Sequence, residues 1–434
     1  MTGAKFIMNF PVTATSHTLA DYRARGGYAT LQKVLTSMKP EDVTKEVTAS
    51  GLLGHGGAAF PVGRKWAVIK SNDGQPHHLC ANADEGEPGT FKDRWILEHA
   101  PHLLVESMLI TSYAIGVRHS FVYIRGEFDL PYRRLQAAVD EAYDAGLLGE
   151  KVLGTDFALD LFVYRGAGSY VCGEASGLLT SIEGKKGYPR NRPPRLTVKG
   201  LYQRPTVVNN VETLSNITGI LAHGAEAFKK TGTAKSPGTQ LVSISGHVVK
   251  PGVYEVEYGY PLARFLYEDC GGILGGRKLK ALIPGGISTK VLTEEDIAPL
   301  TYDHASFDGA GSSLGSGGMI VIADGTCMVR LLQVMLRFYH HESCGQCTPC
   351  REGMGWMHRI IDRIVEGRGA PEDIERLIAI SNANDGTTIC GMGDAAGYAT
   401  VGILAKFRDE FEYFIANKRS KVGGALEVEG VWHA

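Results

Sequence analysis

Four cysteines toward the C-terminal end of the chain have a type and spacing suited to metal chemistry. Cys344, Cys347 and Cys350 stand at every third position of SCGQCTPC, and Cys390 follows in TTICGMGD. One compact loop can offer three thiolates to the corners of an iron–sulfur cluster while the fourth comes from elsewhere. Structural zinc usually takes two separated ligand pairs, so zinc and a chance run of buried cysteines are the weaker alternatives. The spacing predicts a [4Fe-4S] cluster.

Three polar or glycine-rich loops form a second set of candidate binding residues. They are GLLGHGGAAFPVGRKW (51–66), NADEGEPGT (82–90) and GAGSYVCGE (166–174). Backbone without side chains can approach a phosphate or a flat ring, and Lys65 can supply charge. Neither the dinucleotide fingerprint nor the P-loop fingerprint is present. Taken singly, each loop is equally typical of an ordinary turn. The acidic run in 82–90 is typical of a turn exposed to solvent.

Loops and cysteines together indicate a protein that divides the electron pair of a hydride into single electrons. Flavin is the organic cofactor that can both accept a hydride and pass on single electrons. The formal net charge of −2 provides no field for a phosphate backbone, so we expect no nucleic-acid partner. No apolar run is long enough to span a bilayer, and the N-terminus lacks the pattern of a signal or transit peptide. We therefore expect a cytosol-type protein with no direct membrane insertion.

Alternating strand and helix patterns over residues 63–236 predict the layer that positions these loops. Strands are expected at 78–85, 119–127 and 159–168, with helical stretches between them. This order predicts parallel strands covered by helices, with ligands beyond the carboxyl ends of the strands. The other predicted segments are a helical lead-in with a glycine-rich loop (1–62), an α+β module with a hairpin around Lys250-Pro251-Gly252 (237–325), and a four-helix bundle (326–434).

Five motifs carry a resemblance to a known family. GHGGAAFPVGRKW resembles GRGGAGFPTGxKW, while NADEGEPGTFKDR, GAGSYVCGE, VVNNVETL and ESCGQCTPCREG match nearly letter for letter. In this order they are typical of the NADH-oxidising flavoprotein subunit of respiratory complex I and its relatives. The resemblance spans about residues 20–420. It implies a Rossmann-like FMN/NADH domain at 63–236, a ubiquitin-like (β-grasp) module at 237–325, and a helical [4Fe-4S] domain at 326–434.

The resemblance also implies which residues hold the cofactors. FMN would lie against the glycine loop, and NADH would stack its nicotinamide on the flavin near Phe60, Glu85, Glu87 and Glu174. The candidate catalytic residues nearest the hydride transfer are Glu85, Glu87 and Tyr170, although no side chain need act as acid or base. The implied cofactor-binding residues are Gly54, Gly56, Gly57, Ala58, Phe60, Lys65, Asn82, Asp84, Glu85, Glu87, Tyr170, Gly173, Glu174, Arg192, Arg195, Val208, Asn209, Asn210 and Thr213. The implied cluster ligands are Cys344, Cys347, Cys350 and Cys390.

The implied activity is that of the electron-input subunit of an NADH:quinone oxidoreductase. Hydride would pass from NADH to FMN, and electrons would then pass singly to the cluster and to partner subunits. The expected partners are a thioredoxin-like [2Fe-2S] subunit and a large iron–sulfur subunit. The expected location is peripheral, on the cytoplasmic side of the inner membrane or on the matrix side in a mitochondrion. The alternatives are a diaphorase subunit of a NAD(P)-linked hydrogenase or formate dehydrogenase, and a structural subunit without NADH turnover.

The chain departs from the family pattern at the implied adenine clamp. Where the family tends to read Lys-Pro-Pro-Phe, this sequence has Arg192-Pro193-Pro194-Arg195, within a basic stretch at 185–204. One interpretation is a solvated basic loop. The other is tolerance for the 2′-phosphate of NADPH, which the carboxylate of Glu174 would oppose. His55 also stands where the family has arginine, inside the first glycine loop.

Overall fold

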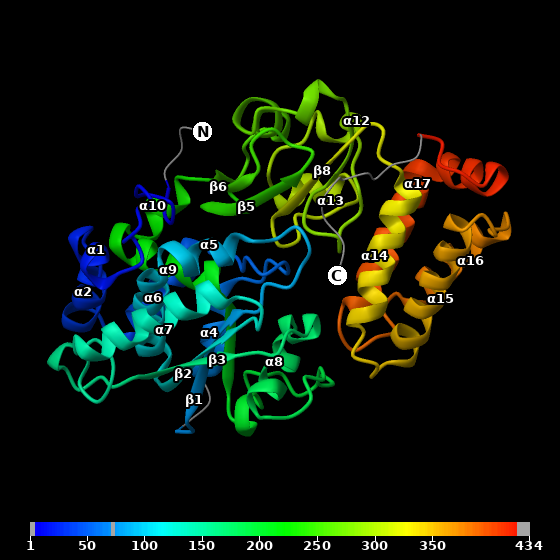
Figure 1. Ribbon diagram of the computed structural model, residues 1–434. Coiled ribbons are helices and arrows are strands. Elements are labelled where there is room, and N and C mark those ends of the chain that lie inside the picture. Colours follow the sequence, from blue (N-terminus) through cyan, green and yellow to red (C-terminus); the bar gives the residue numbers. More distant parts are fainter. Residues whose placement is uncertain (1–4, 71–73, 423–434) are drawn as a thin grey trace. The chain divides into compact units, whose positions relative to one another are not determined.

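The computed structural model describes residues 5–70 and 74–422 (Figure 1). Residues 1–4 and 423–434, the ends of the predicted segments 1–62 and 326–434, lie outside the described residues. The chain divides into two compact units. The first unit comprises Met1–Gly86, Thr90–Ser243 and Val253–Tyr260, and the second comprises Glu87–Gly89, Ile244–Gly252 and Pro261–Ala434.

The first unit is built on a parallel four-stranded sheet with the order β3-β2-β1-β4. Its strands are β1 (His77–Ala83), β2 (Val117–Ile124), β3 (Asp160–Arg165) and β4 (Thr206–Asn210). The three predicted strands correspond to β1, β2 and β3. β4 was missed because it is only five residues long and ends in two asparagines, which are typical of turns rather than strands.

Helices surround this sheet. They are α1 (Leu19–Ala24), α2 (Ala29–Ser37), α3 (Pro40–Ser50), α4 (Val62–Lys70), α5 (Lys92–His99), α6 (Pro101–Ile115), α7 (Asp129–Asp144), α8 (Ala175–Ile182), α9 (Val211–His223) and α10 (Ala225–Lys229). α6 is buried along nearly its whole length and packs with α9 against β1. Pro40 and Pro101 each open a helix, because proline lacks the backbone N–H that a first helical residue leaves unused. The parallel order brings the carboxyl ends of β1 and β4 to one edge.

A second sheet has the order β6-β5-β8-β7, and the boundary between the units passes through β5 and β6. Its strands are β5 (Thr239–Gly246), β6 (Gly252–Glu257), β7 (Leu279–Ile283) and β8 (Gly318–Ala323). β5 and β6 are neighbours, as a hairpin around Lys250-Pro251-Gly252 requires. The short helices here are α11 (Leu262–Arg264), α12 (Glu294–Ile297) and α13 (His304–Gly309).

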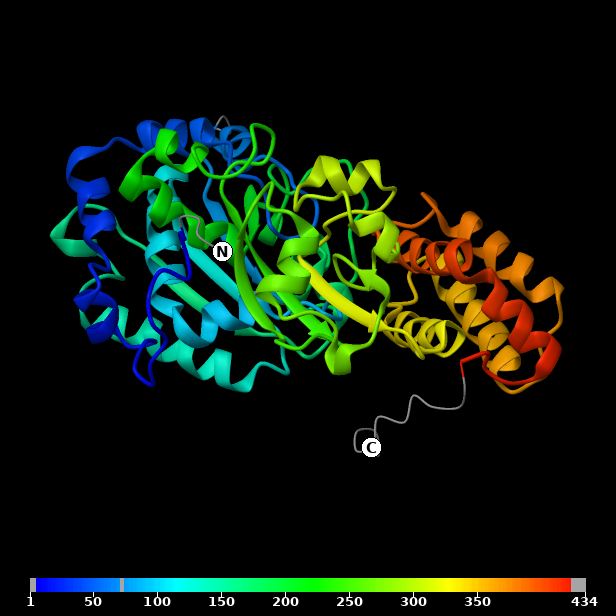
Figure 2. The same ribbon diagram turned by 90° about the horizontal axis from the view of Figure 1, so that it is seen from above.

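The C-terminal region of the second unit is helical, as predicted. Its helices are α14 (Met328–Glu342), α15 (Thr348–Val365), α16 (Glu372–Asn384) and α17 (Met392–Asn417). Each packs against the next and α17 also packs against α14, side by side in both views (Figure 1 and Figure 2). Leu332, Leu336, Met354 and Phe411 are among the fully buried side chains of this bundle. Over residues 5–70 and 74–422, no helix has the length and apolar character needed to cross a membrane.

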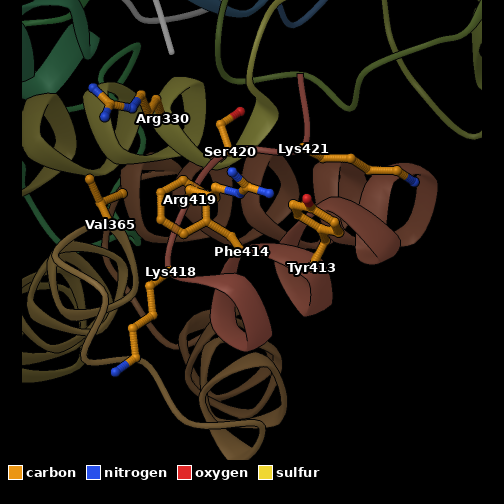
Figure 3. Close-up of a pocket in the computed structure, with 8 residues that line it drawn as sticks. All are labelled: Arg330, Val365, Tyr413, Phe414, Lys418, Arg419, Ser420 and Lys421. Carbon is orange, nitrogen blue, oxygen red and sulfur yellow. The ribbon is translucent and has the colours of Figure 1, made fainter. Parts of the chain in front are cut away.

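A cavity of about 450 Å³ lies beside the C-terminal end of α17 (Figure 3). Its lining includes Val365, which ends α15, and the basic residues Arg330, Lys418 and Arg419. Cations near a helix C-terminus offset the partial negative charge of the last carbonyl groups. Lys418 ends α17 in the left-handed region, with φ 57°. Lys418 and Arg419, which directly follow α17, are placed to make this contribution.

Candidate functional site

The first glycine loop closes on itself and packs against the start of α9. The Gly54 N–H donates to the Phe60 carbonyl at 3.0 Å, and the His55 N–H donates to Thr213 Oγ1 at 2.8 Å. A Cβ at Gly54 would lie 3.3 Å from the Phe60 carbonyl oxygen, and one at Gly56 would lie 3.3 Å from Asn210 Cβ. Gly57 has φ 105°, which favours glycine. The loop is therefore a backbone surface with little room for side chains.

A fully buried charge cluster lies behind this loop. Lys92 Nζ is 2.7 Å from Glu212 Oε2 and 3.0 Å from Asp93 Oδ1, while His55 Nδ1 is 3.1 Å from Glu212 Oε1. Burial alone would lower the pKa of Lys92, but the carboxylates of Asp93 and Glu212 outweigh it and raise that pKa. Burial alone would raise the pKa of Glu212, but Lys92 and His55 bring it to about 2. The cluster therefore holds a protonated lysine against the ionised carboxylate of Glu212.

The turn that follows β4 joins the glycine loop to this cluster. Asn210 Oδ1 caps α9 by accepting from the N–H groups of Glu212 (3.0 Å) and Thr213 (3.3 Å), and its Nδ2 donates to Asp93 Oδ2 at 2.5 Å. Asparagine is a favoured N-cap, because its side chain satisfies helix N–H groups that otherwise lack partners. Trp66 Nε1 donates to Asn209 Oδ1 at 3.3 Å. The VVNNVET motif is thus a strand end, a cap and a buried counter-charge in succession.

Lys65 is a second cation at this turn, besides Lys92. Its Nζ donates to the Val208 carbonyl at 2.9 Å, which places the amine at the carboxyl end of β4. Burial and the guanidinium of Arg192 lower the pKa of Lys65 to about 8. An amine in this environment gains stability from an added negative charge, because desolvation and the neighbouring cation both disfavour its protonated form.

The acidic loop after β1 has two different surroundings. Asn82 Nδ2 donates to the Gly173 carbonyl at 2.9 Å, which ties this loop to the third one. The Glu85 carboxylate accepts from the N–H groups of Asp93 (2.9 Å) and Arg94 (3.0 Å) at the start of α5. Burial and the Asp93 charge raise the pKa of Glu85 to about 8. Glu85 therefore caps α5 inside the first unit, whereas Glu87 belongs to the second unit.

Glu87 is held by hydrogen bonds within the second unit. The Ser288 N–H donates to Glu87 Oε1 at 2.9 Å, and the Ser288 hydroxyl donates to Glu87 Oε2 at 2.8 Å. The Ser288 hydroxyl also lies 3.3 Å from the hydroxyl of Tyr339, a fully buried residue of α14. Burial and the Glu87 charge raise the pKa of that phenol above its usual range. The Tyr339 phenol is therefore a neutral hydrogen-bonding group next to an acid.

The third loop lies beside the second. A Cβ at Gly86 would lie 3.0 Å from the Tyr170 ring, and one at Gly173 would lie 3.3 Å from the Asp84 carbonyl. Gly168 has φ 83°, so this loop also needs glycine conformations. The interlocked loops form a surface of backbone and small residues beyond β1.

Glu174 has both of its carboxylate oxygens engaged. Oε2 caps α8 by accepting from the N–H groups of Ser176 (2.8 Å) and Gly177 (3.0 Å). Oε1 lies 2.6 Å from Nη2 of Arg192, an exposed residue. Arg195 is also exposed. The charge of Glu174 is therefore balanced by a neighbour that belongs to the basic stretch.

The structure brings most of the predicted cofactor-binding residues of the first unit to one edge of the sheet. Phe60 is 47% exposed in the closed glycine loop, with Ala58 in the same loop. Lys92, Asp93 and Glu212 were not predicted, although they belong to the matched motifs. Glu212 carried a signal, because it is a charged residue in the otherwise uncharged stretch 205–222, and a folded chain tolerates a buried charge only when it is paired. Lys92 and Asp93 carried none, because other charged residues surround them in the sequence.

The cysteine site begins at the N-terminus of α15. Cys347 precedes its first residue and Cys350 is buried in its first turn. The Ile389 N–H donates to Cys347 Sγ at 3.4 Å, so the turn that carries Cys390 lies next to Cys347. None of these cysteines is in a disulfide. Within the described residues, no three His, Cys, Asp or Glu side chains converge on a single metal-ion position.

The donor set consists of thiols, the ligands of iron–sulfur clusters. Burial raises the pKa of Cys350, the Ser343 hydroxyl acts in the opposite direction, and the nearby Cys344 and Cys347 add to the rise. The sequence spacing keeps Cys344 and Cys347 within six residues of Cys350. With Cys390 beside them, the residues fit a four-thiolate cluster.

Comparisons with known proteins identify the family of the chain. The family of the Nuo51 FMN-binding domain matches residues 47–219, and the NADH-ubiquinone oxidoreductase-F iron-sulfur binding region matches residues 330–414. An F-type NADH-quinone oxidoreductase subunit of Rhizobium meliloti (strain 1021) is 45% identical over 403 residues, covering 93% of this chain and 96% of the relative. NADH dehydrogenase [ubiquinone] flavoprotein 1, mitochondrial, of Dictyostelium discoideum is 44% identical over 90% of this chain and 82% of the relative.

A solved structure is also similar. The NAD+-reducing [NiFe]-hydrogenase in the air-oxidized state aligns with a TM-score of 0.80 and 33% identity, covering 94% of this chain and 67% of that chain. A parallel sheet with a glycine-loop edge and a helical unit with four thiols define an iron–sulfur flavoprotein oxidoreductase. The chain belongs to the family of F-type NADH-quinone oxidoreductase subunits. As in that family, its cofactors are FMN and a [4Fe-4S] cluster, and its substrate is NADH.

Proposed function

We propose that the edge formed by β1, β4 and the three loops binds FMN and the nicotinamide of NADH. The observation that carries this proposal is the glycine loop, closed by Gly54 and Phe60 and packed on Asn210, with Lys65 at the adjoining strand end. FMN held here would supply hydride acceptance and one-electron release. The protein contributes position and charge: Lys65 faces anionic groups, while Asn82, Asp84, Val208 and Thr213 line the remaining edge.

Purification of the chain with its bound yellow chromophore tests this proposal. NADH bleaches the chromophore if the site binds both molecules. A chain that retains its cluster but contains no FMN after gentle purification would favour the alternative of a structural subunit. The functions named for the relatives with 45% and 44% identity favour quinone-linked electron input, and the similarity to the hydrogenase keeps a diaphorase role as the second candidate.

We infer further that the chain works inside a larger assembly, since the Rhizobium meliloti relative is named as a subunit. The proposed partners are a thioredoxin-like [2Fe-2S] subunit and a large iron–sulfur subunit, with peripheral attachment at the cytoplasmic or matrix side of the membrane. A ubiquitin-like fold is proposed for residues 237–325, supported by a four-stranded mixture of strands and short helices.

Gly56→Ala will weaken FMN retention before it weakens folding. The added Cβ would lie 3.3 Å from Asn210 Cβ, so the loop or the cap of α9 must shift. Overpacking of this kind costs about 1–3 kcal/mol, which corresponds to about a 5- to 150-fold loss of affinity. The flavin content of purified protein measures the effect. Gly309→Ala is the matched control, because its Cβ would meet open space. Full flavin occupancy in Gly56→Ala would show that this loop is an ordinary turn and does not bind FMN.

FMN affinity will fall as the pH rises through about 8. The pKa of Lys65 is about 8 because burial and Arg192 lower it, so the free site loses its cation above that pH. Binding of an anionic flavin then requires proton uptake, which lowers affinity by about tenfold per pH unit. Below pH 8 the amine is already protonated and the affinity is flat. Titration of flavin-stripped protein with FMN measures this profile, and Lys65→Met should bind weakly with no such step.

NADPH will be oxidised alongside NADH at a measurable rate. Arg192 pairs with Glu174 at 2.6 Å, so the carboxylate that would repel a 2′-phosphate is compensated, and Arg195 is exposed nearby in sequence. Arg195→Phe should reduce the ratio of kcat/KM for NADPH to that for NADH by roughly fivefold, the value of one exposed charge contact. Arg192→Met should reduce it further by freeing Glu174. A strong NADH preference that neither variant alters would contradict this proposal.

A further inference from the structure

Ser343 makes a contact with a cluster cysteine that its position in the sequence does not reveal. It follows α14 and directly precedes Cys344, yet its hydroxyl oxygen lies 3.2 Å from Sγ of Cys350. Cys350 is buried, and Ser343 is only partly exposed. The contact therefore joins the end of α14 to the first turn of α15 at the site where the cluster is held.

The direction of this hydrogen bond follows from the chemistry of the ligand. A cysteine that binds a cluster does so as a thiolate, which has no proton to donate. The serine hydroxyl has one, so Ser343 donates and Cys350 Sγ accepts. Such a bond withdraws electron density from the sulfur and stabilises the more negative, reduced state of a cluster.

A chain of hydrogen bonds fixes the position of this hydroxyl. The Ser343 N–H donates to the Tyr339 carbonyl at 3.1 Å, which closes the last turn of α14. The Tyr339 side chain is fully buried, and its hydroxyl lies 3.3 Å from that of Ser288. Ser288 in turn donates twice to Glu87, at 2.9 and 2.8 Å. The contacts of Tyr339 and Ser288 therefore hold the end of α14 that carries Ser343 from its buried side.

We propose that Ser343 is a positioning residue that sets the reduction potential of the [4Fe-4S] cluster through its hydrogen bond to Cys350. The inference rests on the cluster ligands and not on the flavin site. A loss of the FMN proposal would therefore leave it standing.

Ser343→Ala in the purified holoenzyme tests the proposal, with the cluster potential followed by EPR-monitored redox titration. Loss of the bond should make cluster reduction about tenfold less favourable, which for one electron is a fall of about 59 mV. The flavin potential should stay unchanged. Ser343→Thr keeps a hydroxyl and should keep the wild-type cluster potential. Thr348→Val is the matched control. It removes a hydroxyl in the same cysteine motif, but that hydroxyl accepts a hydrogen bond from Arg351 at 3.5 Å.

Two results would overturn the proposal. The first is a Ser343→Ala protein with full iron content and an unshifted cluster potential. The second applies if Ser343→Ala loses its cluster. The proposal then requires Ser343→Thr to retain both the cluster and the wild-type potential, and a threonine variant that does not do so overturns it. If the threonine variant loses the cluster as well, the serine is needed for its size and the hydrogen bond does not set the potential.

Discussion

Lys92→Met will lower the free energy of unfolding by about 3–5 kcal/mol. Lys92 is 1% exposed and lies within 3.0 Å of carboxylate oxygens of both Asp93 and Glu212. Methionine fills much of the same volume but leaves these carboxylates buried without their cation. Urea denaturation of the whole chain measures the loss. Lys45→Met is the control, because Lys45 pairs with Asp42 on an exposed helix face, where such pairs contribute little.

The sign of the pH dependence gives this prediction a second test. In Lys92→Met the buried carboxylates lose their principal cation, so their pKa values rise, that of Asp93 further above its ordinary range. A carboxyl group with a raised pKa stabilises the fold at low pH and loses that contribution as the pH rises. The deficit of the variant should therefore shrink on acidification. Adding Glu212→Gln to Lys92→Met should recover part of the lost free energy of unfolding. A loss below about 1 kcal/mol for Lys92→Met at neutral pH would contradict a buried charge pair between Lys92 and these carboxylates.

The sequence indicates candidate site residues more readily than the residues that support them. Glycine-rich loops indicate close backbone approach to a bound molecule. The three cysteines in SCGQCTPC indicate ligands of one metal cluster. Both patterns can be seen in the sequence because each is local. Parallel pairing is not local: β4 lies beside β1, far from it along the chain, and its asparagines obscured it. For the same reason the partners of Glu85 were out of reach, because it accepts from N–H groups at the start of α5, eight and nine residues further along the chain.

The split surroundings of the acidic loop illustrate the same limit. Glu85 and Glu87 are two residues apart and were expected to share one role near the nicotinamide. In the structure Glu85 caps α5, while Glu87 is held by Ser288 of the second unit. Residues this close in sequence can serve different partners, because the backbone turns over residues 84–86 and the partners come from distant parts of the chain. Only the folded chain reveals which partner each one meets.

Cys390→Ala will abolish the [4Fe-4S] cluster while leaving the flavin reducible by NADH. Cys390 is the proposed ligand most distant in sequence, and the Ile389 N–H bond to Cys347 Sγ at 3.4 Å places its turn next to Cys347. A cluster with three thiolates has an exposed iron corner, so iron content and the EPR signal should fall with electron delivery to the partner subunits. NADH bleaching of the flavin should persist, because the residues proposed to bind FMN lie in the first unit. Cys270→Ala, a change at a buried cysteine with no role in the motif, is the control. Full iron content in Cys390→Ala would show that the fourth ligand lies elsewhere.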